Sequence, residues 1–258
     1  MIIGNKKFEN YTYVMAIINL TPDSFYSASR TSCDEVLFKT ERAIKDGAAI
    51  IDLGAQSTRP GYTEVPPEEE LARLEKPLTA ILKNFDIPVS VDTYFPSVAK
   101  AAFDMGAHLL NDIWGLTAEG MANIVAKANG SVCIMHNAKS KLEGDIFPQI
   151  ESFLSSSVQK ALDAGVDREK ICLDGGIGFA KDKEQNWQLL NGYGRLNKLG
   201  YPLLLGTSRK SMFGGDVKDR LQATVNSTRL AVRDKVLFVR VHDVKENFQA
   251  IKEEYERN

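Results

Sequence analysis

The run Val14-Met15-Ala16-Ile17-Ile18-Asn19 is a short apolar stretch that ends in a polar residue, and this pattern returns seven more times along the chain. A single strand with a polar tip says little. Eight of them, separated by stretches of helix length, predict parallel strands whose carboxyl ends face one place. The runs are Val14–Ile18 before Asn19, Ile50–Leu53 with Asp52, Val89–Val91 before Asp92, Leu109–Leu110 before Asn111, Val132–Met135 before His136, Ile171–Leu173 before Asp174, Leu203–Leu205 before Gly206-Thr207-Ser208, and Val236–Val241, which includes Arg240 and precedes His242.

Amphipathic stretches with a helical period lie between these runs. Glu68–Leu82 places Leu74 and Leu78 on one stripe, and Pro66-Pro67 suits its first turn, where a missing N–H costs nothing. The other predicted helices are Glu35–Lys45, Pro96–Met105, Glu119–Lys127, Phe147–Ala164, Lys183–Leu199, Asp219–Arg233 and Val244–Tyr255. Strict alternation of strands and helices predicts a parallel sheet, and eight units predict an α/β fold of the (β/α)₈ TIM-barrel type.

An open doubly wound sheet is the alternative arrangement. It is disfavoured because no Gly-x-Gly-x-x-Gly follows the first strand and no Walker-type loop is present. Met1–Tyr13 is predicted to form a short N-terminal β-hairpin that caps the bottom of the barrel. Residues 1–258 are predicted to form a single barrel domain, because no linker or low-complexity stretch divides them.

Composition excludes some classes of partner. The formal net charge of −2 gives no broad basic field, so neither nucleic acid nor an anionic membrane is expected as a partner. Cys33, Cys133 and Cys172 match no metal spacing, and the last two fall inside predicted strands, as expected for buried, reduced thiols. With no apolar leader and no stretch of membrane-spanning length, the chain is predicted to be cytoplasmic.

Ring closure would make the last strand a neighbour of the first two, so their polar tips are expected to form one group. This group combines an amide, hydroxyls, two guanidinium groups and an imidazole, with few carboxylates expected at the same position. Its members are Asn19, Ser57-Thr58-Arg59, Arg240 and His242. Arginine binds phosphate oxygens in a bidentate way, so this group predicts a phosphate or pyrophosphate site. A surface ion pair is the alternative role for either arginine alone.

A second group comes from the other strands. This group would present two carboxylates, a carboxamide and an ammonium, which suit a planar heterocycle with several N–H donors. Its members are Asp92, Asn111, Asp174 and Lys210. Asp92 could instead cap the following helix. Asp174 precedes a run of glycines where no helix is expected, which favours a functional placement.

Two further features bear on this second group. Gly206–Ser211 is predicted to be a turn that opens a helix, whose N-terminus would favour negative charge. Arg209 within it is expected to be a structural or rim cation. His136 could line the site, His108 is expected to be structural, and the three histidines give no zinc signature.

Motifs in the same order resemble those of the dihydropteroate synthase family over nearly the whole chain. Ala16–Phe25 is similar to the first signature of that family, and Asp52–Gly61 is similar to the second. The remaining blocks are Ser90-Val91-Asp92-Thr93, Asn111-Asp112-Ile113, Met135-His136, Asp174–Phe179, Gly206–Ser211 and Arg240–Val244.

The resemblance implies an Mg²⁺-dependent transferase on a pterin-binding barrel. Such an enzyme joins p-aminobenzoate to 6-hydroxymethyl-7,8-dihydropterin pyrophosphate, giving 7,8-dihydropteroate and pyrophosphate. It implies a catalytic set of Asp92, Asp174, Lys210, Arg240 and His242, and a pterin site of Asp92, Asn111, Ile113, Met135, Asp174, Phe179, Gly206 and Lys210. It implies pyrophosphate contacts from Asn19, Thr58, Arg59, Arg240 and His242, with Mg²⁺ on Asn19, and p-aminobenzoate contacts from Phe25, Pro60, Phe179 and Ser208. The resemblance also allows a homodimer.

The chain departs from the family pattern at Tyr26-Ser27-Ala28-Ser29, Gln56 and Gly175. The change in the first loop motivates one alternative, a divergent paralogue that binds pterin without turnover. A methyltetrahydrofolate-type methyltransferase on the same barrel is the other alternative. It would share the Asp and Asn contacts to pterin, but it needs no site for an anionic leaving group.

Overall fold

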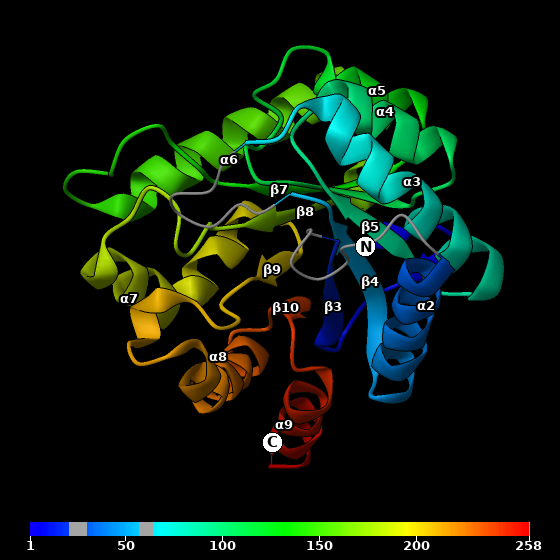
Figure 1. Cartoon of the computed structure of the whole chain (residues 1–258). Coiled ribbons are helices and arrows are strands. Elements are labelled where there is room, and N and C mark those ends of the chain that lie inside the picture. Colours follow the sequence, from blue (N-terminus) through cyan, green and yellow to red (C-terminus); the bar gives the residue numbers. More distant parts are fainter. Residues whose placement is uncertain (21–29, 57–63, 258) are drawn as a thin grey trace.

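The computed structural model describes residues 1–20, 30–56 and 64–257, and its centre is a closed parallel barrel. The strand order around the barrel is β10-β3-β4-β5-β6-β7-β8-β9, so the last strand pairs with the first (Figure 1). The bounds are β3 Tyr13–Asn19, β4 Ala48–Gly54, β5 Val89–Asp92, β6 Leu109–Asp112, β7 Ser131–Met135, β8 Ile171–Asp174, β9 Leu203–Leu205 and β10 Phe238–Val241. The predicted TIM barrel is confirmed.

Helices connect successive strands and lie outside the sheet (Figure 1). Their bounds are α2 Arg30–Lys45, α3 Pro67–Asn84, α4 Pro96–Asp104, α5 Met121–Lys127, α6 Ile146–Asp163, α7 Lys183–Asn191, α8 Leu221–Arg233 and α9 Val244–Arg257. Short 3₁₀ helices occupy Arg168–Lys170, Tyr193–Leu199, Ser211–Phe213 and Val217–Arg220. Among the residues described, no helix is both long and apolar enough to cross a membrane.

Alternate residues of each strand face opposite sides of the barrel wall. In β3, Val14 and Ala16 pack in the outer core against the helices, whereas Met15 packs in a second, inner core. Ile50, Leu109 and Leu204 fill the same inner core from their own strands. The inner positions nearer the carboxyl ends are polar, so the barrel interior changes from apolar at the base to polar at the top.

The predicted N-terminal hairpin is present as β1 Ile2–Ile3 paired antiparallel with β2 Lys6–Lys7. Ile3 and Phe8 belong to the inner core, and the Phe8 ring lies edge-on to Phe238 with 5.4 Å between the ring centroids. Ser131 Oγ at the start of β7 donates to the Ile2 carbonyl. The hairpin therefore closes the base of the barrel.

Two predicted helices differ from those observed. The helix expected over Lys183–Leu199 ends at Asn191, because Gly192 breaks it and Tyr193 then turns its side chain into the core. The helix expected to open at Gly206–Ser211 does not form. Gly214 and Gly215 adopt positive φ angles of 71° and 59°, and only a single 3₁₀ turn, Ser211–Phe213, precedes them. The predicted helix N-terminus at this turn, with its preference for negative charge, is therefore wrong.

We expect Phe8→Ala to lower the free energy of unfolding by about 3–5 kcal/mol, because it empties a buried position that the Tyr13 and Phe238 rings contact. Urea denaturation measures the change. Phe38→Ala is the matched control, since that ring is 62% exposed and its loss should cost no more than about 0.5 kcal/mol. Equal losses in the two variants would contradict a base sealed by the hairpin.

Candidate functional site at the carboxyl ends of the strands

The inward polar row at the top of the barrel brings together residues from distant parts of the sequence. Asn19 is in register with Gly54, Gly54 with Asp92, and Asp92 with Asn111. Gly54 has no side chain, and a Cβ there would lie 3.6 Å from Asn19 Oδ1 and 3.9 Å from Asp92 Cβ. The space between the amide and the carboxylate therefore stays open.

Arg240 of β10 crosses the interior and binds two carboxylates. Its Nε donates to Asp52 Oδ2 at 2.6 Å, and a terminal nitrogen donates to Asp92 Oδ2 at 2.5 Å. Burial opposes its charge, but Asp52 and Asp92 outweigh that effect and hold the pKa of Arg240 above its ordinary value. The expectation that few carboxylates face this arginine is wrong, because Arg240 joins the two groups that the sequence separated.

Asp52 is a site residue that the sequence reasoning did not assign. It is fully buried in β4, on the inner face two residues before Gly54. The signal for it was a charged residue inside an apolar run, since burial of a carboxylate demands a cationic partner.

Asp92 does not cap the next helix. The N-cap position of α4 is Phe95, and the Thr93 hydroxyl, not Asp92, accepts from the Phe95 N–H at 3.2 Å. Burial raises the pKa of Asp92, and the charge of Arg240 opposes that shift. Among the described residues, the buried Oδ1 atoms of Asp52 and Asp92 have no hydrogen-bond partner, which is unusual for buried carboxylate oxygens.

Asp174 ends β8 and is held by its own loop. Its Oδ1 accepts from the Gly176 N–H at 2.7 Å and lies 3.0 Å from the Tyr193 hydroxyl, which in turn accepts from the Gly175 N–H. Burial raises the pKa of Asp174. Its Oδ2 faces Gly206, where a Cβ would lie 3.6 Å away. The contact from Tyr193 had no signal in the sequence.

Lys210 follows β9 and reaches the loop after β8. Its ammonium donates to the Ile177 carbonyl and lies 4.7 Å from the centroid of the Phe179 ring. Burial lowers the pKa of Lys210 to about 8, although the charge of Asp174 opposes that shift. The structure thus brings Lys210, Asp174 and Phe179 together, as their predicted common site requires.

His242 connects the first and last parts of the site. Its Nδ1 lies 2.9 Å from Ser208 Oγ, and its Nε2 lies 3.5 Å from Asn19 Nδ2. Because Asn19 Nδ2 can only donate, these contacts favour an imidazole that is protonated on Nδ1. The neighbouring Arg209 instead makes a bidentate pair with Asp243, as expected for a structural cation.

The remaining predicted residues fall into two classes. Ile113 and Met135 are buried beside the polar row, and Met135 is in register with Asp174. Phe25, Thr58, Arg59 and Pro60 lie outside the described residues. Within residues 1–20, 30–56 and 64–257, no cluster of three or more His, Cys, Asp or Glu side chains could hold a metal ion.

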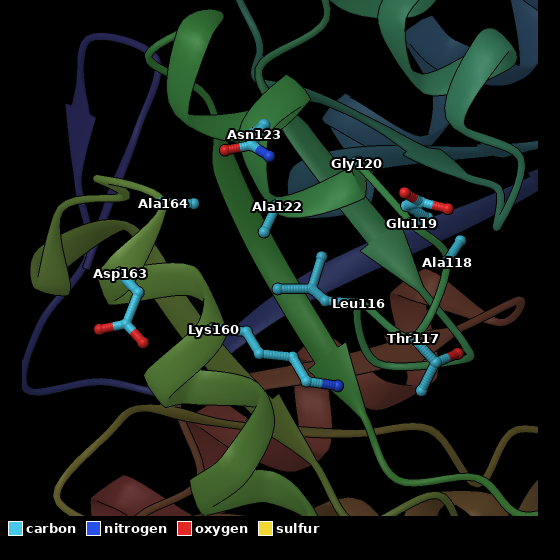
Figure 2. A pocket seen from close by; sticks show the side chains of 10 residues that line it. All are labelled: Leu116, Thr117, Ala118, Glu119, Gly120, Ala122, Asn123, Lys160, Asp163 and Ala164. Carbon is cyan, nitrogen blue, oxygen red and sulfur yellow. The ribbon is translucent and has the colours of Figure 1, made fainter.

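A hollow of about 470 Å³ lies elsewhere, on the outer wall between α5 and α6. Figure 2 shows Leu116 and Ala122 between the two sides of the hollow, with Lys160 of α6 extending toward Leu116. None of its lining residues belongs to the polar row, so it is separate from the candidate site.

Comparison with known proteins gives consistent matches. The family described as pterin binding enzyme matches residues 15–242. A dihydropteroate synthase of Clostridium beijerinckii is 45% identical, covering 98% of this chain and 97% of that protein. The structure of the Clostridium difficile dihydropteroate synthase in the presence of pteroic acid superposes with a TM-score of 0.94 at 41% identity, covering 98% of both chains. The Xanthomonas albilineans enzyme with 4-aminobenzoic acid gives 0.91 at 34% identity, covering 96% of this chain and 93% of that one.

We expect Arg240→Met to lower the free energy of unfolding by about 3–5 kcal/mol at pH 8, because Asp52 and Asp92 lose their buried cation. In the variant, the folded-state pKa of Asp92 rises further above its unfolded value. The folded state then binds more protons, so part of the lost stability should return as the pH falls toward 5.

Urea denaturation at several pH values measures this effect. Arg209→Met is the control, since that arginine pairs with Asp243 at the rim and its loss should cost less than about 1 kcal/mol at every pH. An Arg240→Met protein whose stability deficit does not shrink on acidification would refute the electrostatic role.

Proposed function

The chain belongs to the pterin-binding enzyme family, and on that premise we propose that it is a dihydropteroate synthase. It condenses 6-hydroxymethyl-7,8-dihydropterin pyrophosphate with p-aminobenzoate to give 7,8-dihydropteroate and pyrophosphate. The observation that carries the proposal is one rim on which Asp92, Asn111 and Asp174 lie beside the Arg240 guanidinium and the His242 imidazole. The transferred group is a pterinylmethyl group, which makes the enzyme a transferase of an alkyl group other than methyl.

The acceptor side of this rim supports pterin binding. A pterin ring has several N–H donors along one edge, and the unpaired Oδ1 of Asp92, the Oδ2 side of Asp174 and the Asn111 amide are acceptors at matching strand ends. Ile113, Met135 and Phe179 supply apolar surface for the ring faces. Gly206 keeps the wall beside Asp174 thin, and Lys210 would donate to a ring acceptor.

The cationic side supports the leaving group. When the C–O bond at the pterin methylene breaks, its electron pair leaves with the pyrophosphate and a delocalised cation remains on the pterin. Asp92 and Asp174 stabilise that cation, while Arg240 and His242, with Thr58 and Arg59, stabilise the anion. The aniline nitrogen of p-aminobenzoate then forms the new C–N bond and loses its proton to solvent. Phe25, Pro60, Phe179 and Ser208 are the proposed contacts of this second substrate.

Mg²⁺ is proposed to act with the leaving pyrophosphate. Mg²⁺ keeps several waters and is usually held by one or two carboxylates together with substrate phosphates, so with a neutral amide as its protein ligand it would depend mainly on the pyrophosphate oxygens. Asn19 directs Nδ2 toward His242 and Oδ1 toward the open space at Gly54, which fits that arrangement. When bound, the ion would neutralise charge that develops on the pyrophosphate.

Two further expectations, on location and oligomeric state, accompany this function. A cytoplasmic location is supported by Cys133 and Cys172, which are buried and free although they lie opposite each other in β7 and β8. A homodimer is the second expectation, and light scattering on the purified chain would measure the oligomeric state.

Purified protein incubated with both substrates and Mg²⁺ is expected to release pyrophosphate and 7,8-dihydropteroate in equal amounts, as measured by chromatography. Lys210→Met and Asp92→Asn should each lower kcat/KM at least about 100-fold, because each removes a charge that meets the reacting pterin. Their circular dichroism spectra should match that of the parent protein.

Lys160→Met is the control for this experiment, since Lys160 lines the separate hollow on the outer wall. Its activity should equal that of the parent protein. Pterin binding without product in the parent protein would instead indicate the paralogue that does not turn over. Parent-level activity in Lys210→Met would overturn the assigned pterin site.

A further inference from the structure

Lys181 is a second lysine close to Asp174, and it has no role in the site described so far. It lies seven residues beyond Asp174, in the loop that joins β8 to α7. Its Nζ lies 3.0 Å from His136 Nδ1, 3.0 Å from the Gly176 carbonyl and 3.0 Å from the Phe179 carbonyl. An ammonium has three N–H donors, so these three acceptors use all of them.

The loop folds back on itself so that this ammonium can lie inside it. Gly176 and Gly178 adopt φ angles of 71° and 86°, and Ala180 adopts 50°. A Cβ at Gly176 would lie 1.9 Å from the His136 carbonyl, so the loop packs directly against the end of β7. Lys181 thus ties the curled loop to itself and to the neighbouring strand.

The segment that Lys181 holds is also the segment that forms one wall of the pterin site. The Gly176 N–H binds Asp174, the Ile177 carbonyl accepts from Lys210, and the Phe179 ring lies beside the Lys210 ammonium. Gly176, Ile177 and Phe179 all lie between Asp174 and Lys181 in the sequence. The contacts that Lys181 makes with the Gly176 and Phe179 carbonyls therefore help to position the groups that meet Asp174 and Lys210.

His136 is the uncharged partner in this arrangement. Burial, together with the charge of Lys181, lowers the pKa of His136 to about 3. The imidazole is therefore neutral at ordinary pH, and its Nδ1 accepts a hydrogen bond from the Lys181 ammonium. The positive charge of the pair belongs to Lys181.

Several charged or titratable groups act on Asp174. Burial raises its pKa, and the charges of Lys210 and Lys181 lower it. Among the described residues, Asp174 also interacts with the Tyr193 hydroxyl, the Cys133 thiol and the Arg240 guanidinium. Burial lowers the pKa of Lys181 to about 7, so this lysine is charged at acidic pH.

We propose that Lys181 is a positioning residue of the pterin site: it fixes the loop from Asp174 to Ala180 and places a second cation close to the Asp174 carboxylate, which accepts hydrogen bonds from the pterin. The proposal rests on the proposed function, because it assumes that Asp174 binds a pterin. Lys181 itself acts through Asp174 and the loop and does not touch the ligand.

The test measures the affinity of the full chain for 6-hydroxymethylpterin by calorimetry between pH 4.5 and 9. Affinity should fall on acidification, as Asp174 becomes protonated. In Lys181→Met and Lys181→Gln, the pKa of Asp174 rises, so this fall should begin about one pH unit higher than in the parent protein. At the pH where the parent protein is half-affected, that shift corresponds to a several-fold loss of affinity.

Two further variants separate charge from structure. Lys181→Arg retains the charge and should return the acidic fall to the parent pH, even if the bulkier guanidinium weakens binding at every pH. Lys183→Met removes an exposed lysine two residues further on and should leave the whole profile unchanged. Thermal denaturation of each variant verifies that it is folded.

An acidic fall at the parent pH in both Lys181→Met and Lys181→Gln would overturn the proposal, as would an equal shift in Lys181→Arg or Lys183→Met. A parent protein that binds no 6-hydroxymethylpterin at any pH would instead refute the proposed function. The two failures are thus distinguishable.

Discussion

The pairing of Arg240 with Asp52 and Asp92 is the interaction on which the site depends. The three residues come from β10, β4 and β5, so they meet only because β10 pairs with β3 and closes the sheet into a ring. The guanidinium compensates two carboxylates that burial would otherwise neutralise. Asp92 can then present its remaining oxygen as an acceptor, while the same cation stays at the edge where a leaving anion would lie.

Buried carboxyl groups and cations lie together in the described part of the site. Arg240 binds Asp52 and Asp92, and the charges of Lys210 and Lys181 act on Asp174. Each cation is held by oxygen atoms or a ring nitrogen of the protein before any ligand arrives. Such an arrangement needs little reorganisation during the reaction, which is the main source of electrostatic stabilisation in enzymes.

The sequence predicted the barrel and most of the row at its rim, because parallel strands buried on both sides give apolar runs and functional residues follow their carboxyl ends. It assigned Asp92, Asn111, Asp174 and Lys210 to one group, and the structure brings them to one rim. It could not place Arg240 between Asp52 and Asp92, since side-chain reach across a barrel depends on register and not on spacing. Tyr193 was equally hidden, because a glycine break in the predicted helix redirects it inward. The contacts of Lys181 depend on positive φ angles in its loop, which spacing alone does not reveal.

The hairpin at the base has a consequence for the passage of ligands. Ile3 and Phe8 fill the lower end of the ring, so the interior is closed on that side. Both reactants and both products must therefore pass through the single mouth at the carboxyl ends of the strands.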